Sequence, residues 1–66
     1  MITKEYLIGK GFKENENGIF FLGRWYYYDF NTRFFGLSDG IGIELKEIKD
    51  EQDLERLYFA LEEKKL

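Results

Sequence analysis

The pattern of apolar and polar positions divides this chain into a strand-like middle and a helix-like C-terminal end. In the middle, apolar residues stand at every second position or run together in short blocks, as they do in strands. Near the C-terminus, Leu54, Leu57, Tyr58 and Leu61 recur with the spacing of one face of a helix. Asp50 stands where it can cap that helix, so a C-terminal amphipathic helix is predicted.

The first residues carry the signals of a short N-terminal helix. Thr3 can cap its start, and Ile2 and Leu7 stand at the two positions of a hydrophobic staple. Gly11 can adopt the left-handed conformation that often ends a helix. We therefore predict a helix over residues 3–10.

Turn-forming residues separate the apolar blocks of the middle segment. Asn17-Gly18, between two such blocks, is a strong hairpin signal because both residues tolerate a positive φ. We predict four or five antiparallel strands at 12–14, 19–22, 24–30, 33–37 and 41–46. Aromatic residues on both faces of 24–30 suit a central strand, whereas Ile41, Ile43 and Leu45 predict a half-buried strand with one wet face.

Together these elements predict a single small α+β domain over residues 1–66. A short N-terminal helix, a meandering antiparallel sheet and a C-terminal amphipathic helix follow one another, with the helices packed on one face of the sheet. The sequence holds seven Phe, five Tyr and one Trp among 66 residues. One core of this size is too small for so many rings, so we expect some to be at least half exposed.

Composition argues against several classes of function. There is no His and no Cys, which removes the commonest metal ligands, general base and thiol nucleophile, so we expect neither an enzyme nor a metal or other cofactor. Asp29, Asp39 and Glu44 could pair as catalytic carboxylates, but turn and strand-surface roles account for them. The net charge of −3 argues against a general nucleic-acid binder.

Targeting signals are missing from the pattern as well. Charged residues interrupt the first 20 positions, so no signal-peptide core is predicted, and no apolar run reaches the length of a membrane span. We therefore expect a cytoplasmic protein.

An aromatic run in the middle of the chain is the candidate partner-binding site. Tyr, Trp and Arg are enriched at binding hot spots. The candidate residues are Arg24, Trp25, Tyr26, Tyr27, Tyr28 and Arg33. The same rings could serve the core and cross-strand pairing instead, or stack on single-stranded nucleic acid. Glu51, Glu55 and Glu62 form a candidate acidic face, which is either solvated or meets a basic partner.

The segment L-x-x-L-Y-F-A-L at residues 54–61, together with the opening residues 2–13 and the tyrosine-rich middle, resembles small uncharacterised proteins of phage and prophage regions. The resemblance carries no known activity. It implies a mobile-element setting, in which small acidic proteins often inhibit host defence systems by binding them.

These observations lead to three hypotheses. The first is a non-enzymatic protein-binding module, an inhibitor of a host or defence protein of the phage or prophage type. The second is a nucleic-acid-binding regulator that uses the aromatic sheet face. The third is a structural subunit of a homo-oligomer.

Overall fold

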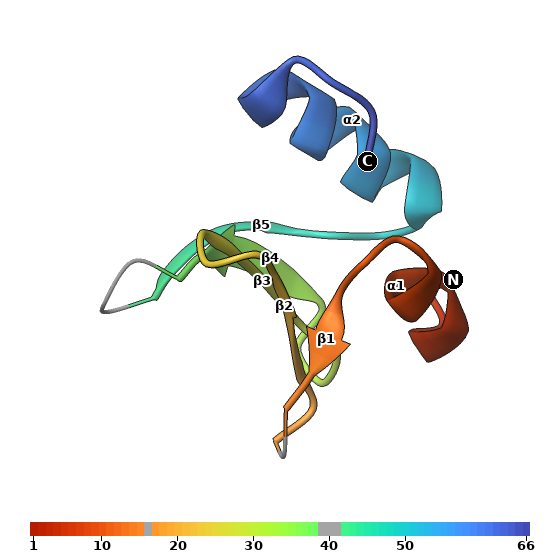
Figure 1. The fold of residues 1–66 in the computed structure, drawn as a ribbon, viewed down its shortest axis with the longest axis vertical. Coiled ribbons are helices and arrows are strands. Elements are labelled where there is room, and N and C mark those ends of the chain that lie inside the picture. The colour runs from red at the N-terminus through yellow and green to blue at the C-terminus, as the bar shows by residue number, and fades with distance from the viewer. Residues whose placement is uncertain (16, 39–41) are drawn as a thin grey trace.

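The structure is a computed structural model that describes residues 1–15, 17–38 and 42–66. Its elements are α1 (Lys4–Gly9), β1 (Lys13–Glu14), β2 (Ile19–Leu22), β3 (Tyr26–Asp29), β4 (Phe34–Leu37), β5 (Ile43–Glu47) and α2 (Glu51–Glu62). Across the described residues, the strands form one antiparallel sheet in chain order (Figure 1). The predicted α+β meander between two helices is confirmed.

Local capping explains where α1 begins and ends. The Thr3 hydroxyl accepts a hydrogen bond of 3.1 Å from the backbone N–H of Tyr6, which satisfies one of the free donors of the first turn. At the other end, the Phe12 N–H donates to the Leu7 carbonyl at 3.0 Å, while Gly11 has a φ of 100°. This is a Schellman termination, and it confirms the predicted caps.

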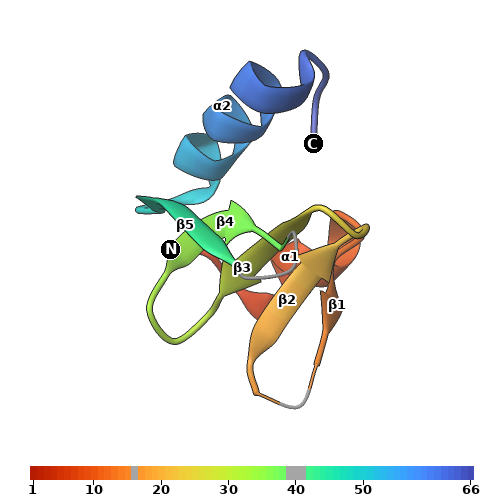
Figure 2. The same cartoon turned by 90° about the vertical axis from the view of Figure 1, so that its left-hand side faces the viewer.

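One face of the sheet, here called the inner face, forms the core. Phe20, Tyr28 and Phe35 are in register across β2, β3 and β4, and all three are buried. Leu7 of α1 and Leu54 of α2 belong to the same buried cluster, so both helices cover this face. Figure 2 views the sheet from the opposite side, here called the outer face, with α1 behind the strands.

The C-terminal helix is held to the sheet by few apolar side chains. Asp50 caps it by accepting from the Asp53 N–H at 2.8 Å, as predicted. Its buried residues are Leu54 and Tyr58, and the Tyr58 ring meets the Tyr26 ring edge to face at 5.7 Å. Leu61 is 41 % exposed, so the buried stripe ends one turn earlier than its spacing predicts.

The predicted half-buried strand at 41–46 is wrong in its burial. The strand exists as β5, but every residue in it is exposed, including Ile43 and Leu45. Among the described strands β5 pairs with β4 alone, and a register shift opposite Phe35 and Gly36 interrupts that ladder. Neither helix covers these side chains, and Ile41 lies outside the described residues.

Several predicted strands begin later in the structure, β1 at Lys13 rather than at 12, and for two others the difference concerns an arginine. β3 starts at Tyr26 rather than at 24, and β4 starts at Phe34 rather than at 33. In both cases an arginine that the pattern placed in a strand belongs to the preceding turn instead. The predicted turn at 38–40 falls mostly on residues outside those the structure describes.

Candidate interaction surface

The outer face of the sheet carries aromatic side chains that neither helix covers. Phe21, Tyr27 and Phe34 alternate with the buried residues of β2, β3 and β4, so they point to the opposite side. All three are partly exposed. None of the three belongs to the core cluster, and no helix lies in front of the strands on this side of the sheet (Figure 2).

Tyr27 lies at the centre of this face, and its ring has room over β4 because the residue beside it on that strand has no side chain. Gly36 is its register partner on β4, and a Cβ added to Gly36 would lie 2.7 Å from a carbon of the Tyr27 ring. The ring therefore lies flat on the backbone of β4. Burial, followed by the nearby carboxylates of Glu44 and Asp29, raises the pKa of Tyr27, so its hydroxyl remains a neutral donor.

The charges around the outer face are mainly negative. Glu44 and Glu47 of β5 pair with Gly36 and Phe34, which places them on this face, and Asp29 ends β3. Lys13 of β1, the register partner of Phe21, supplies positive charge at the opposite edge. Negative charge along β5 disfavours contact with nucleic-acid phosphates at that edge.

The predicted partner-binding residues divide between the core and the surface. Tyr26 and Tyr28 are buried in the inner-face core, at 9 % and 2 % exposure, which removes them from any contact surface. Alternation along β3 sends them to one side and Tyr27 to the other, so at most every second residue of the run can meet a partner.

Arg24 and Trp25 lie in the turn between β2 and β3, and both are exposed. The Trp25 side chain is 55 % exposed. Its carbonyl accepts from the Ser38 N–H at 2.9 Å, and the Arg24 carbonyl accepts from the Ser38 hydroxyl at 2.8 Å. These bonds fix the turn against the end of β4, so the indole is presented from an ordered backbone.

Arg33 does not join the other five residues. It lies in the turn between β3 and β4, at the opposite end of these strands from Trp25, with a φ of 68°. Arg24 and Trp25 directly precede the strand that carries Tyr27, whereas Arg33 follows its other end, so the predicted set does not form one cluster.

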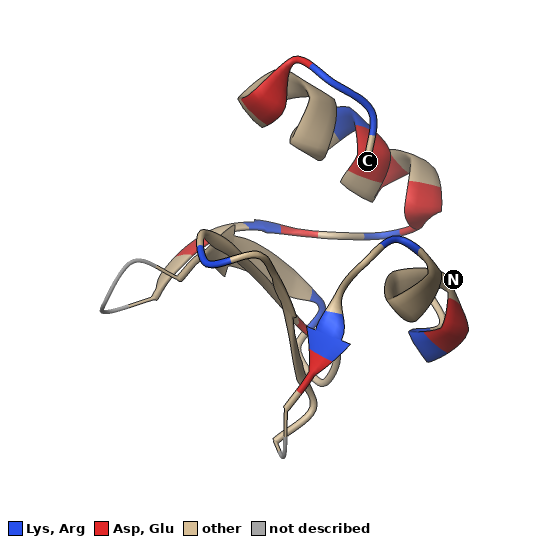
Figure 3. Cartoon of the chain, in the orientation of Figure 1, with Lys and Arg blue, Asp and Glu red and all other residues tan. Residues whose placement is uncertain are grey.

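The predicted acidic face is largely occupied in holding α2 to the rest of the domain. Glu55 accepts a hydrogen bond of 2.6 Å from the Tyr6 hydroxyl, and Glu62 accepts one from the Tyr26 hydroxyl. Glu51 is half-buried near Tyr6. Although acidic residues are concentrated on α2 (Figure 3), two of the three predicted residues face inward rather than toward a partner.

The structure describes two of the three carboxylates offered as catalytic candidates. Asp29 and Glu44 lie on either side of Tyr27, but the Asp29 carboxylate accepts from the N–H groups of Asn31 and Thr32 at 2.9 and 3.3 Å, as in a turn. Asp39 lies outside the described residues. In the described part of the chain, no group of three acidic, His or Cys side chains could hold a metal ion.

Sequence reasoning missed one group of exposed apolar residues. Ile43 and Leu45 of β5 and Phe59 of α2 are each more than 40 % exposed. The sequence contained one sign of this exposure: Phe59 follows Tyr58 directly and widens the apolar side of α2 beyond a simple stripe. The exposure of β5 depends on where α2 crosses the sheet, which the local pattern does not contain.

Comparison with protein families, curated proteins and solved structures found no match to this chain. Neither helix in the described ranges has the length and apolar character needed to cross a bilayer. The geometry of the surface itself therefore carries the functional argument.

Proposed function

We propose that this protein is a non-enzymatic protein-binding module. Its contact surface consists of the outer-face residues Phe21, Tyr27 and Phe34, together with Trp25. The observation that carries the proposal is an aromatic sheet face that both helices leave uncovered. Exposed clusters of aromatic residues mark protein interfaces more often than they serve folding alone.

The distribution of rings supports this proposal. Six of the thirteen aromatic side chains are buried, namely Phe12, Phe20, Tyr26, Tyr28, Phe35 and Tyr58. The other seven retain exposure, and Trp25 and Phe59 are more than half exposed, as the composition predicts. Tyr6 and Phe30 pack against the core from its edge, so the rings that remain for a partner are the three of the outer face, Trp25 and Phe59.

The size of the surface is adequate for a specific complex. The folded chain exposes 4745 Å². A standard interface buries about 800 Å² per partner, roughly one sixth of that total. The resemblance to phage and prophage proteins leads us to propose a host or defence protein as the partner, with inhibition by binding as the mode of action.

Affinity capture from a host lysate tests the contact surface if matched variants are compared. Trp25→Ala and Phe21→Ser should each reduce retention of the partner by at least tenfold, because hot-spot truncations commonly cost about 2 kcal/mol or more. Phe59→Ala is the matched control, since Phe59 is 54 % exposed, almost the same as Trp25, but lies on α2. A partner that is lost with Phe59→Ala and retained with Trp25→Ala would refute the proposed surface.

A second candidate, a homo-oligomer subunit, is favoured by one specific arrangement. Lys13, Phe21, Tyr27, Gly36 and Glu44 form a continuous row across the outer face. A two-fold axis parallel to the strands would place Lys13 of each copy over Glu44 of the other, with Tyr27 near the axis. Such self-complementarity is what an isologous dimer requires.

A charge exchange distinguishes this candidate from binding to a different protein. Sedimentation should show that Lys13→Glu and Glu44→Lys each weaken dimerisation, because each brings like charges together. The double variant should restore it. A chain that sediments as a monomer at all concentrations would exclude the dimer and leave the first proposal intact.

A further inference from the structure

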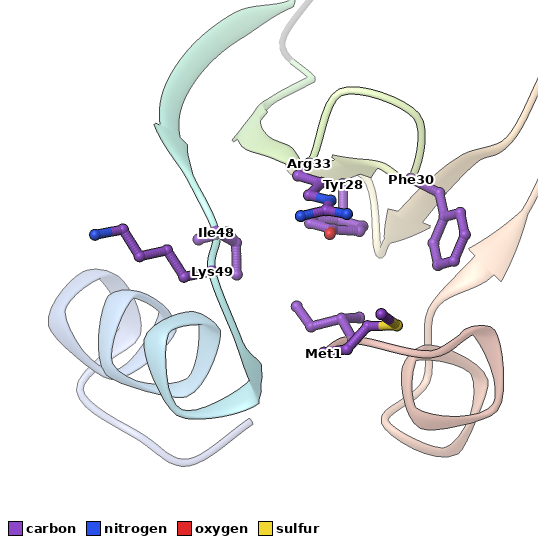
Figure 4. A pocket seen from close by; sticks show the side chains of 7 residues that line it. Met1, Tyr28, Phe30, Arg33, Ile48 and Lys49 are labelled. Carbon is purple, nitrogen blue, oxygen red and sulfur yellow. The ribbon is translucent and has the colours of Figure 1, made fainter.

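A cavity of about 280 Å³ lies on the inner side of the sheet, away from the contact surface. It opens between the N-terminal residues, the end of β3 and the link from β5 to α2 (Figure 4). Ile2, Tyr28, Phe30 and Ile48 make its walls apolar. Its volume is close to the lower end of small-molecule sites, which begin near 300 Å³.

The Tyr28 hydroxyl is the first polar group in this cavity. The residue is only 2 % exposed, but no hydrogen bond joins its hydroxyl to another residue that the structure describes. The hydroxyls of Tyr6 and Tyr26, by contrast, both donate to glutamates. No enclosed polar side-chain atom of the described residues lacks a partner, so this hydroxyl is accessible from the cavity. Burial of the rest of the residue raises the pKa of Tyr28, so the hydroxyl keeps its proton as a donor toward the cavity.

Arg33 supplies the second polar group. Arg33 and Tyr28 both line the cavity, on the side across from Met1 (Figure 4), and the Arg33 charge is near enough to oppose the effect of burial on the pKa of Tyr28. The two ion pairs formed between described residues are Lys4–Glu14 and Lys46–Asp53, so no described carboxylate neutralises Arg33.

The backbone of Arg33 is held from both sides. Its N–H donates to the Asp29 carbonyl at 2.7 Å, and its carbonyl accepts from the Ile48 N–H at 2.8 Å. These bonds keep it at a φ of 68°, a conformation that is unfavourable for a residue with a side chain. A strained and clamped backbone that aims a cation into a cavity is typical of a ligand site.

We propose that this cavity binds a small carboxylate with an apolar body, such as an aromatic acid. The guanidinium of Arg33 and the hydroxyl of Tyr28 hold the carboxylate, while Ile2, Phe30 and Ile48 contact the body. The Lys49 ammonium points away from the cavity (Figure 4). Of the two basic side chains that line the cavity, that of Arg33 is therefore the one available to a carboxylate.

This inference does not rest on the proposed function. Tyr28 and Tyr27 are neighbours on β3 and point to opposite faces of the sheet. A ligand in the cavity leaves the outer face free. The two proposals can therefore fail separately.

Titration of the isotope-labelled chain with benzoate, followed by amide NMR shifts, tests the site. Saturable shifts should centre on Arg33, Tyr28 and Ile48, with a Kd of about 1 mM or tighter. Benzamide, which has the same shape without the charge, should bind at least tenfold more weakly. Absence of localised shifts at about 10 mM benzoate, or equal shifts with benzamide, would overturn the proposal.

Variants separate a ligand site from adventitious binding. Arg33→Gln should weaken benzoate at least tenfold, and Tyr28→Phe, which keeps the ring, by about three- to tenfold. Arg24→Gln removes an exposed arginine far from the cavity and should leave the affinity unchanged. Preserved amide spectra establish that each variant folds. Equal losses in Arg24→Gln and Arg33→Gln would show general charge attraction rather than a site.

Discussion

Replacing glycine by alanine should have opposite effects on stability at two positions of this chain. Gly36 is buried, and a Cβ added there would clash first with the backbone carbonyl of Ile43 on β5 and then lie 2.7 Å from the Tyr27 ring. Gly9 stands in the last turn of α1, and an added Cβ there would meet nothing within 4 Å. The surroundings of each glycine therefore decide the sign of the effect.

We expect Gly36→Ala to lower the free energy of unfolding by about 2–3 kcal/mol, because the ring or the strand must shift. Gly9→Ala is the matched control and should raise it by about 0.5–1 kcal/mol, since alanine favours a helix. Chemical denaturation of the two variants measures both changes. Similar destabilisation by both would contradict the packing of Tyr27 on β4.

Arg33 shows a conflict between stability and binding at a single residue. Arg33→Gly should raise the free energy of unfolding by about 0.5–1 kcal/mol, because glycine adopts a φ of 68° without steric cost. The same variant should lose the carboxylate site. Thermal unfolding with and without benzoate measures both effects, and a destabilised Arg33→Gly variant would show that the side chain supports the fold.

Whether the role of a residue can be predicted from the sequence depends on how far along the chain its contacts lie. Thr3 and Gly11 act within a few positions along the chain, so the caps of α1 follow from the sequence alone. Gly36 and Arg33 acquire their roles from strand pairing, since their decisive neighbours come from β3 and from the link after β5. Local patterns contain no information on such partners.

At the scale of elements, α2 is attached largely by polar contacts. Tyr6 and Tyr26 donate to Glu55 and Glu62, and Lys46 pairs with Asp53 near the start of the helix. The hydrogen bond from Lys46, followed by the Lys49 N–H, lowers the pKa of Asp53. The helix itself was predictable from its spacing and cap, but its docking was not, because the acidic residues suggested a solvated face.

The tyrosine contacts predict a loss of stability in alkali. The hydrogen bond to Glu62, together with burial, raises the pKa of Tyr26 from 10.0 to about 12, and burial beside Glu55 raises that of Tyr6 as well. The unfolded chain therefore loses these protons first, so the free energy of unfolding falls as the pH rises from about 10 through 12. Denaturation at several pH values measures this slope.

Tyr26→Phe isolates one contribution to that slope. The variant lacks the hydroxyl, so its stability should fall less steeply between pH 10 and 12 than that of the unmodified chain. Between pH 7 and 9 the group is protonated in both the folded and the unfolded chain, so the difference in stability between the two proteins should not change with pH. Identical slopes for the two chains would mean that Tyr26 does not hold α2.

For the whole molecule, the uneven distribution of contacts predicts that unfolding begins at one end. β3 pairs with strands on both sides and contributes Tyr26 and Tyr28 to the core. α2 contributes Leu54 and Tyr58, with Leu57 packed beside them, and is otherwise joined by the tyrosine–glutamate hydrogen bonds. The overall α+β order could be predicted from the sequence, but this difference in attachment required the structure.

Native-state hydrogen exchange should resolve the two regions. Amides of α2 should exchange through a partial opening of lower free energy than those of β3, which should report global unfolding. Tyr6→Phe should speed exchange in α2 while leaving β3 protection nearly unchanged. Uniform protection across both elements would instead indicate a single cooperative unit.

The chain contains one tryptophan, and it projects from the turn between β2 and β3 with 55 % of its surface in water. Its fluorescence should therefore resemble that of the denatured chain before any partner arrives, making it an insensitive probe of unfolding. Docking of a protein on the outer face would bury the indole and shift its emission to the blue. The emission of Trp25 should therefore report binding of a protein to the outer face. A ligand in the distant cavity should leave that emission unchanged.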